Sequence, residues 1–296
     1  MTKVLFISNF STPDYLADSV YTGLNKLENV EIYTYACPTH LIKGIGYNDN
    51  NILCNRYTNK KQVPAFFYSN KIENPPFVEQ PNHVISSIKE KKYDIILYGN
   101  CFRDLLHFDL VEQHYPKEKI IVLDGEDYAI YKEDIANKST YYKREITNDS
   151  FLAHVKPISF GVPDDLLLNQ MPLKLRPLAK VIPGDFSTYV YRDEKTYFKD
   201  YQRSFFGKTT KKGGWDCARH YEILANRCIP YFPDLKYCPK YIMVDFPKEL
   251  ILYTNKYSHF KSIPPDYNLI NYQIYEHTKK KLLCTVIAKK LLHNSL

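Results

Sequence analysis

The chain has 296 residues, a length that predicts two domains of about 150 residues each. Hydrophobic residues make up 44% and charged residues 25%, which excludes an intrinsically disordered chain, and 27 tyrosines and 16 phenylalanines give it unusual aromatic weight. The net charge of +7 suits anionic partners such as nucleotide diphosphates, nucleic acid or membrane surfaces, without choosing among them.

Two features of the whole sequence bear on its compartment. The seven cysteines show no CxxC or Cys/His ligand spacing, so we expect reduced thiols and no metal centre; they are at positions 37, 54, 101, 217, 228, 238 and 284. Near the start, the only apolar run is the short VLFIS at 4–8, so neither a signal peptide nor a membrane span is predicted. The expectation is a cytoplasmic protein.

The first half alternates predicted strands and helices. Strands are predicted at 3–9, 30–37, 93–100 and 119–127, helices at 14–27, 82–92 and 102–115, and a long loop with short elements over 38–81. This alternation is typical of a parallel sheet in a nucleotide-handling fold. The first turn, SNFSTPD, lacks the GxGxxG pattern, which disfavours a site for NAD or FAD.

The second half repeats this alternation after a domain boundary. A looser charged stretch over 128–148 and the run VKPISFGVPDD place the boundary between residues 158 and 159. Strands are predicted at 178–185, 229–232 and 241–246. Helices are predicted at 194–207, from about 215 to 228 and at 247–253, with one or two terminal helices over 267–292. The predicted fold is therefore α/β, with two Rossmann-like domains, 1–158 and 159–296, facing each other across a cleft.

The stretch 203–239 carries the strongest functional signal. A basic turn, KKGG at 211–214, precedes a helix predicted to begin near Trp215 or Asp216, and the free N–H groups of such a helix favour an anion. Arg219 and Glu222 lie about one turn apart, where a guanidinium suits a diphosphate and a carboxylate suits ribose hydroxyls. We therefore predict a nucleotide-sugar site. The donor-binding residues expected are Lys208, Lys211, Lys212, Gly213, Gly214, Trp215, Arg219, Glu222 and Pro230.

An alternative explains the same stretch without a ligand. An amphipathic helix packed on a sheet would have the same apolar spacing, with Arg219 and Glu222 as a solvated ion pair. Pro230 and the two aromatic residues after it would then be an ordinary core strand rather than the floor under a base or sugar. His220 is expected to be a packed or phosphate-contacting group rather than a base.

The run GWDCARHYEILANRCIPYFPDL at 214–235 resembles the donor-binding segment of GT-B glycosyltransferases. The similarity is greatest to short exostosin-like enzymes of bacteria and large algal viruses, which carry an RxYExLAxxCIPYF pattern, and it is specific over roughly residues 200–250. One departure is Arg227, where such enzymes usually have glycine. The resemblance implies a GT-B fold whose last helix returns to the first domain, a UDP-sugar donor rather than a GDP-sugar, an inverting reaction, and a glycan-building role in a host cytoplasm if the chain is viral.

The acceptor side should lie on the first domain, where open α/β sheets bind ligands at the carboxyl ends of their strands. The candidates for the catalytic base are Asp14, Asp18 and Asp124, although an aspartate at the position of Asp14 is also the commonest helix cap. Glu126 and Asp127 follow Asp124 and are predicted to bind the acceptor, with a solvated loop as the alternative. Because fixed donors would stabilise the leaving diphosphate, no metal and no cofactor besides the nucleotide sugar is required.

Two rival functions fit parts of the sequence. A metal-dependent GT-A transferase would use Asp124 and Asp127 to hold Mn²⁺ or Mg²⁺. A nucleic-acid or glycan binding module would use the lysines and tyrosines, and the lysines at 279–281 and 289–290 would suit a peripheral membrane contact. We favour the glycosyltransferase, with a nucleotide sugar and a glycan acceptor as partners and no nucleic acid.

Overall fold

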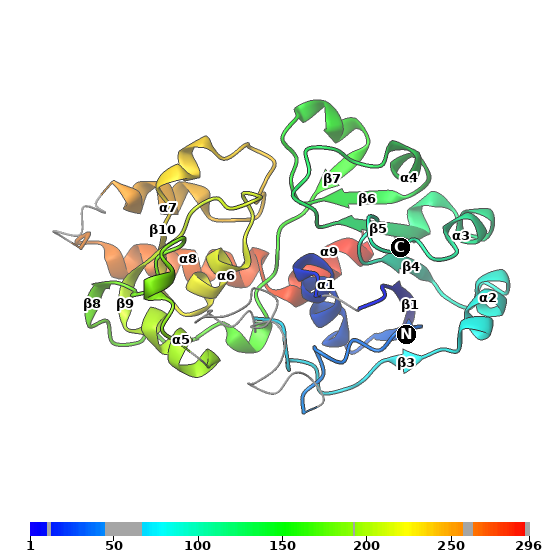
Figure 1. The fold of residues 1–296 in the computed structure, drawn as a ribbon, viewed down its shortest axis with the longest axis horizontal. Helices are drawn as coiled ribbons and strands as arrows, with labels where there is room; N and C mark the ends of the chain where they lie inside the picture. The colour runs from blue at the N-terminus through cyan, green and yellow to red at the C-terminus, as the bar shows by residue number, and fades with distance from the viewer. Residues whose placement is uncertain (11–12, 45–66, 192, 257–262, 294–296) are drawn as a thin grey trace.

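The computed structural model describes residues 1–10, 13–44, 67–191, 193–256 and 263–293, and shows an α/β protein with two parallel sheets (Figure 1). The larger sheet has seven strands in the order β3-β2-β1-β4-β5-β6-β7. Its strands are β1 (Thr2–Ile7), β2 (Val30–Thr34), β3 (Phe77–Val78), β4 (Ile95–Tyr98), β5 (Ile120–Asp124), β6 (Thr140–Lys143) and β7 (Val155–Pro157). The smaller sheet has the order β10-β9-β8, formed by β8 (Arg176–Leu178), β9 (Ser204–Lys208) and β10 (Ile229–Tyr231).

The large sheet is covered by helices on both faces because its central strands are apolar on both sides. In β1, Val4 and Phe6 join one core cluster while Leu5 and Ile7 join the other, and all four are fully buried. The first cluster includes residues of α1 (Tyr15–Asn25) and α9 (Cys284–His293). The second includes residues of α2 (Pro81–Lys89), α3 (Phe108–His114) and α4 (Glu133–Lys138).

The small sheet forms the centre of the second part of the molecule. Its helices are α5 (Glu194–Gln202), α6 (Ala218–Ala225), α7 (Lys248–Asn255) and α8 (Tyr267–Lys281). α6 lies between β9 and β10 in the sequence, so these two parallel strands and their helix form a βαβ unit. The chain leaves the large sheet after β7, and α9 comes back to it, lying beside α1 (Figure 1).

The two crossings between the parts are bonded to each other. The N–H of Val162 donates to the carbonyl of Leu282 at 2.6 Å, and the N–H of Cys284 donates to the carbonyl of Val162 at 2.9 Å. α9 then packs so closely on α1 that a Cβ atom on Gly23 would lie 2.0 Å from the carbonyl oxygen of Cys284. The first and last helices are therefore one packing unit.

Several predicted elements are wrong in the first half and at its boundary. The stretch 128–148, expected to be loose, contains α4 and the buried strand β6. Its charged residues did not indicate a buried strand because one of them, Lys143, is buried only through its ion pair with Asp124. The helix predicted over 102–115 begins only at Phe108. Part of the predicted loop over 38–81, residues 45–66, lies outside the described residues, as does Cys54. The other six cysteines form no disulfide.

The second half also departs from the predicted pattern. The helix predicted over 194–207 ends at Gln202, and β9 follows, because Phe206 pairs with strands on both sides of it. The first strand of the second half is β8, which ends at Leu178, where the predicted strand 178–185 begins. Residues 241–246 form turns instead of a strand, with Met243 at a φ of 51° and the Lys248 ammonium bonded to nearby backbone carbonyls. Among the described helices, none has the length and apolar composition needed to cross a membrane.

The contact between α1 and α9 can be tested by changing Gly23 to Ala. The added methyl group meets backbone atoms of Cys284, so we expect a loss of about 1 to 3 kcal/mol in the free energy of unfolding, measured by urea denaturation. Lys289→Ala on the exposed face of α9 is the control and should change it by less than about 0.5 kcal/mol. Equal stability of the two variants would show that α9 does not pack on α1 as described.

Candidate functional site

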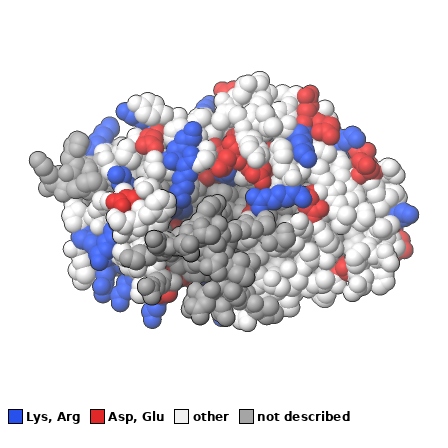
Figure 2. Space-filling model, in the orientation of Figure 1, with Lys and Arg blue, Asp and Glu red and all other residues white. Residues whose placement is uncertain are grey.

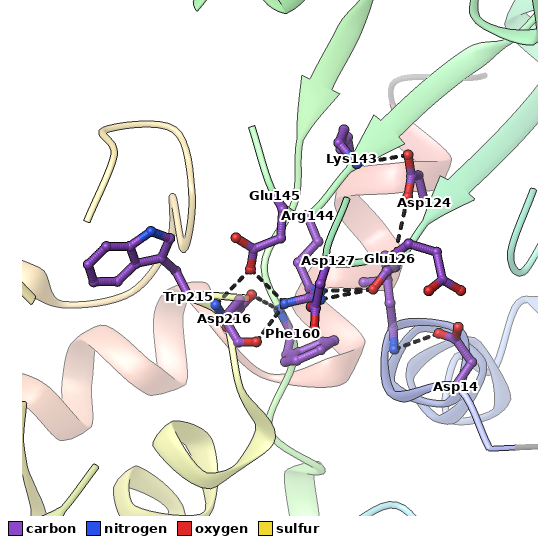
Figure 3. A network of polar contacts seen from close by, with 12 residues as sticks. Asp14, Asp124, Glu126, Asp127, Lys143, Arg144, Glu145, Phe160, Trp215 and Asp216 are labelled. Atoms are coloured by element: carbon purple, nitrogen blue, oxygen red, sulfur yellow. Dashed lines mark hydrogen bonds and ion pairs between the residues drawn. The ribbon is translucent and has the colours of Figure 1, made fainter. Parts of the chain in front are cut away.

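A buried arginine joins the two parts at the carboxyl ends of their strands (Figure 3). Arg144 directly follows β6 and is only 3% exposed. Its Nη1 donates to the backbone carbonyl of Asp216 at 2.5 Å and to Glu145 Oε1 at 2.7 Å. The same Glu145 oxygen accepts the backbone N–H of Asp216 at 2.8 Å. Two neighbouring side chains therefore bind both backbone groups of one residue in the other part.

The surroundings of Arg144 keep it charged. Burial opposes the charge, but the carboxylates of Asp216, Glu145 and Asp127 outweigh it and raise the pKa of Arg144. Its guanidinium also lies over the Phe160 ring, with 4.9 Å between Cζ and the ring centroid. For Asp216, burial raises the pKa to about 7 although the charge of Arg144 opposes this.

The predicted glycine turn and a predicted acceptor residue are in contact. Arg144 Nη2 donates to Asp127 Oδ1, and this places the Asp127 carboxylate against the turn. A Cβ atom on Gly213 would lie 2.4 Å from Asp127 Oδ2, and one on Gly214 would lie 2.5 Å from Asp127 Oδ1 and from Glu145 Oε1. A larger residue at either position would therefore displace these carboxylates. Because two carboxylates lie beside it, the turn is a poorer site for a diphosphate than the sequence indicated.

Arg219 lies in the first turn of α6, which begins at Ala218, two or three residues later than predicted. The side chain is buried, and its Nη2 donates to the Tyr189 hydroxyl at 3.4 Å. Nε and Nη1 are buried without a hydrogen-bond partner among the described residues. Leaving charged donors unpaired away from water is costly, so this guanidinium is suited to an anionic partner.

Glu222 lies one turn further along α6 and is 6% exposed. Its Oε2 accepts a hydrogen bond from the Tyr197 hydroxyl at 2.6 Å, and the Tyr197 and Tyr201 hydroxyls are 2.9 Å apart. Burial raises the pKa of Glu222, while the Tyr197 bond and the charge of Arg219 oppose the rise. The alternative of a solvated Arg219 and Glu222 pair is wrong, because both side chains are buried.

His220 is a packed residue of α6. The ring is fully buried, its Nε2 lies 2.8 Å from the Trp215 carbonyl, and its Nδ1 lies 2.8 Å from Thr209 Oγ1. Since a carbonyl can only accept, Nε2 carries the proton and Nδ1 accepts from the hydroxyl. Burial lowers the pKa of His220 to about 3, so the ring is neutral at ordinary pH. It connects the end of the glycine turn to the loop after β9.

The other predicted donor residues lie around this turn. Lys208 ends β9, and the Lys211 ammonium lies 5.3 Å from the centroid of the Trp215 ring. The Lys212 N–H donates to the Gly214 carbonyl at 3.0 Å. Trp215 points away from Arg144 (Figure 3) and packs near Phe232, and Pro230 is buried in β10, as in a core strand.

A second polar cluster lies where the strand order of the large sheet reverses, between β1 and β4. Asn100, just after β4, donates from Nδ2 to Asp14 Oδ2 at 2.6 Å and to Glu126 Oε1 at 2.9 Å. Arg103 Nε donates to the same Glu126 oxygen at 3.0 Å, and its Nη2 lies 3.6 Å from Asp14 Oδ2. Doubly wound sheets bind ligands at such a reversal.

The three candidate bases have different surroundings. Asp14 caps α1, since its Oδ1 accepts the N–H groups of Leu16 and Ala17. Asp18 is buried and lies 2.9 Å from His40 Nε2, and burial raises the pKa of this carboxyl although His40 opposes it.

Asp124 is fully buried and its two oxygens are both engaged. Oδ1 accepts the Glu126 N–H at 3.2 Å, and Oδ2 accepts from Lys143 at 3.0 Å and from Tyr141 at 2.8 Å. Burial raises the pKa of Asp124, and Lys143 opposes the rise. This is a structural ion pair, so the geometry does not support Asp124 as a base or as a metal ligand. Among the described residues, no group of three or more His, Cys, Asp or Glu side chains is arranged to hold a metal ion.

Sequence reasoning missed four residues of these clusters: Asn100, Arg103, Arg144 and Glu145. Asn100 had a usable signal, because it is the last residue of the strand predicted at 93–100, at the sheet edge where ligands bind. Arg144 and Glu145 had none, because β6 itself was not predicted.

The departure at Arg227 has a structural explanation. Its backbone adopts a φ of 53°, the left-handed conformation that glycine favours after a helix. The side chain offsets this cost, since Nε donates to Asn271 Oδ1 at 2.9 Å and the guanidinium lies 4.1 Å from the centroid of the Tyr275 ring. Arg227 therefore attaches α6 to α8.

No protein-family model matches the chain, and a search of curated proteins finds no match.

The buried state of His220 predicts how stability depends on pH. Its pKa in the folded chain is about 3, below the ordinary value of 6.5, so between these values the unfolded chain binds the proton more readily. This contribution to stability is lost as the pH falls below 6.5, by about 1.4 kcal/mol per unit down to about pH 3. The free energy of unfolding of the wild type, measured by urea denaturation, should therefore fall more steeply from pH 6 to pH 4 than that of His220→Gln. Parallel curves would contradict this assignment.

Proposed function

We propose that this chain is a glycosyltransferase of GT-B architecture that transfers a sugar from a nucleotide diphosphate, with UDP favoured, to a glycan hydroxyl. Four observations support it: two parallel sheets, carboxyl strand ends that meet at Arg144, a buried arginine with two unpaired donors in the second part, and a carboxylate cluster at the strand reversal of the large sheet. The resemblance over residues 200–250 supplies the reaction class.

The observation that carries the proposal is the buried guanidinium of Arg219. Its unpaired Nε and Nη1 point from different edges of the guanidinium and would each donate a charge-assisted hydrogen bond to a different phosphate oxygen of the donor. The first turn of α6 adds the positive end of the helix dipole. In this proposal Arg219, rather than the amides of Gly213 and Gly214, is the main diphosphate contact.

Glu222 would fix the ribose. Its Oε2 already accepts from Tyr197, and a carboxylate has further lone pairs for hydroxyl donors. The tyrosines at 189, 197 and 201 surround Arg219 and Glu222 and would limit access of water to the diphosphate.

The acceptor base would be Glu126. Its side chain is 19% exposed, compared with 8% for Asp14, and it is aligned by Asn100 and Arg103. The acceptor proton would pass to a Glu126 oxygen while the acceptor oxygen attacks the anomeric carbon. The bond from that carbon to the diphosphate breaks, and Arg219 stabilises the negative charge that the leaving UDP gains. Attack from the side opposite the leaving group inverts the anomeric carbon.

Changing Arg219 to Gln separates a ligand role from a structural one. UDP should raise the melting temperature of the wild type, and the variant should bind UDP about 10- to 100-fold more weakly, as expected for lost hydrogen bonds to a charged group. The melting temperature without ligand should stay the same or rise, because a buried unpaired charge is removed. Arg203→Gln, an exposed arginine of the same part, is the control. An unchanged UDP response in Arg219→Gln would refute the diphosphate assignment.

Changing Glu126 to Gln should stop turnover without affecting the donor site. The amide keeps the shape but cannot take the acceptor proton, so we expect kcat for UDP release to fall about 10²- to 10⁴-fold with the thermal response to UDP unchanged. Glu133→Gln, an exposed residue of α4, is the matched control. Full activity of Glu126→Gln would show that another group is the base.

A further inference from the structure

An exposed aromatic side chain lies beside the carboxylate cluster. Tyr128 is 56% exposed, in the loop after β5, and its ring packs edge-on against Phe102, with 5.8 Å between centroids and 66° between planes. Phe102 comes from the loop after β4, and the Lys132 ammonium lies 5.1 Å from the centroid of its ring. Phe102 therefore holds the Tyr128 ring from the side while more than half of the Tyr128 surface stays accessible.

The position of Tyr128 follows from its two preceding neighbours. Glu126 accepts hydrogen bonds from Asn100 and Arg103, and Asp127 lies against the glycine turn of the other part. These three consecutive residues belong to three neighbouring features. Glu126 is part of the polar cluster, Asp127 contacts Arg144 where the two parts meet, and Tyr128 packs on Phe102. Phe102 in turn directly precedes Arg103 of the polar cluster.

The chemistry around Tyr128 favours an uncharged ring with hydroxyl groups. An exposed tyrosine face takes the apolar C–H face of a pyranose, and Arg103 and Glu126 are placed to bond its hydroxyls. A nucleic acid base would also stack, but its phosphates would bring negative charge beside the carboxylates of Glu126 and Asp127, which already balance the charges of Arg103 and Arg144. On the face shown in Figure 2, acidic side chains gather where the two parts meet, and basic ones lie scattered on both sides.

We infer that Tyr128, supported by Phe102, is the stacking surface of an acceptor subsite for a neutral pyranose residue of a glycan. The inference rests on the proposed function and extends it, because it names the acceptor class and the residue that binds it. Tyr128 acts by positioning: it holds the sugar so that one hydroxyl lies near Glu126.

Saturation-transfer NMR of the full chain tests the inference without a donor. The probes are the methyl pyranosides of glucose, galactose, mannose, xylose, rhamnose and N-acetylglucosamine. At least one should show saturation strongest on the C–H protons of one ring face, and Tyr128→Ala should weaken that binding about tenfold or more. Tyr128→Phe, which keeps the ring, and Tyr272→Ala, a tyrosine of α8 with a similar exposure of 54%, should leave it unchanged.

Each other outcome contradicts the inference. These are no saturation with any of the pyranosides, even saturation over the whole sugar, equal binding by Tyr128→Ala, or a decathymidylate probe that binds at Tyr128 when no pyranoside does. The one-face pattern is measured on the wild type, so it does not depend on the folding of a variant. UDP binding, followed separately, distinguishes the two proposals. If UDP binds and the pyranosides do not, only the subsite fails; if pyranosides bind at Tyr128 and UDP does not bind, the donor proposal fails.

Discussion

The bonds from Arg144 and Glu145 to the backbone of Asp216 are the constraint on which the candidate site depends. Both side chains follow β6 at the edge of the large sheet, and both bind one residue between β9 and α6. They fix the carboxyl ends of strands from two sheets against each other. Separating a buried arginine from the carboxylates that balance its charge costs roughly several kcal/mol in free energy. The junction formed by Arg144, Glu145 and Asp216 is therefore expected to be rigid. As a consequence, the position of the polar cluster around Asn100 is fixed relative to the start of α6.

The same junction changes how the glycine turn is understood. In the sequence, lysines and glycines before a helix indicate an anion site. That interpretation takes no account of the side chains that pack against the turn in the folded chain. In the folded chain Asp127 and Glu145 lie against Gly213 and Gly214, so the glycines allow the close approach of two carboxylates. The buried donors without a partner among the described residues are Nε and Nη1 of Arg219, in the first turn of α6. The two parts of this sequence motif therefore have different roles. The glycine turn packs against carboxylates, and the buried Arg219 is the candidate anion contact.

Much of the fold could be predicted because apolar runs and helical spacing are local signals. β1, β4 and β5 are apolar on both faces, and α1, α8 and α9 follow from spacing alone. β6 could not be predicted, because Lys143 is buried only through its pairing with Asp124, nineteen residues away. Of the candidate site, Arg219, Glu222, Asp14 and Glu126 could be proposed from sequence, from their positions beside predicted strands and turns. Arg144 and Glu145 were not, since their role exists only when the two sheets meet. The burial that makes Asp124 structural likewise depends on a distant lysine.

The most direct test of the central claim is a crystal structure with UDP bound. The account predicts that phosphate oxygens lie within hydrogen-bond distance, about 3 Å, of Arg219 Nε and Nη1, and that ribose hydroxyls face Glu222. A diphosphate bound elsewhere, with Arg219 still without an anionic partner, would contradict it.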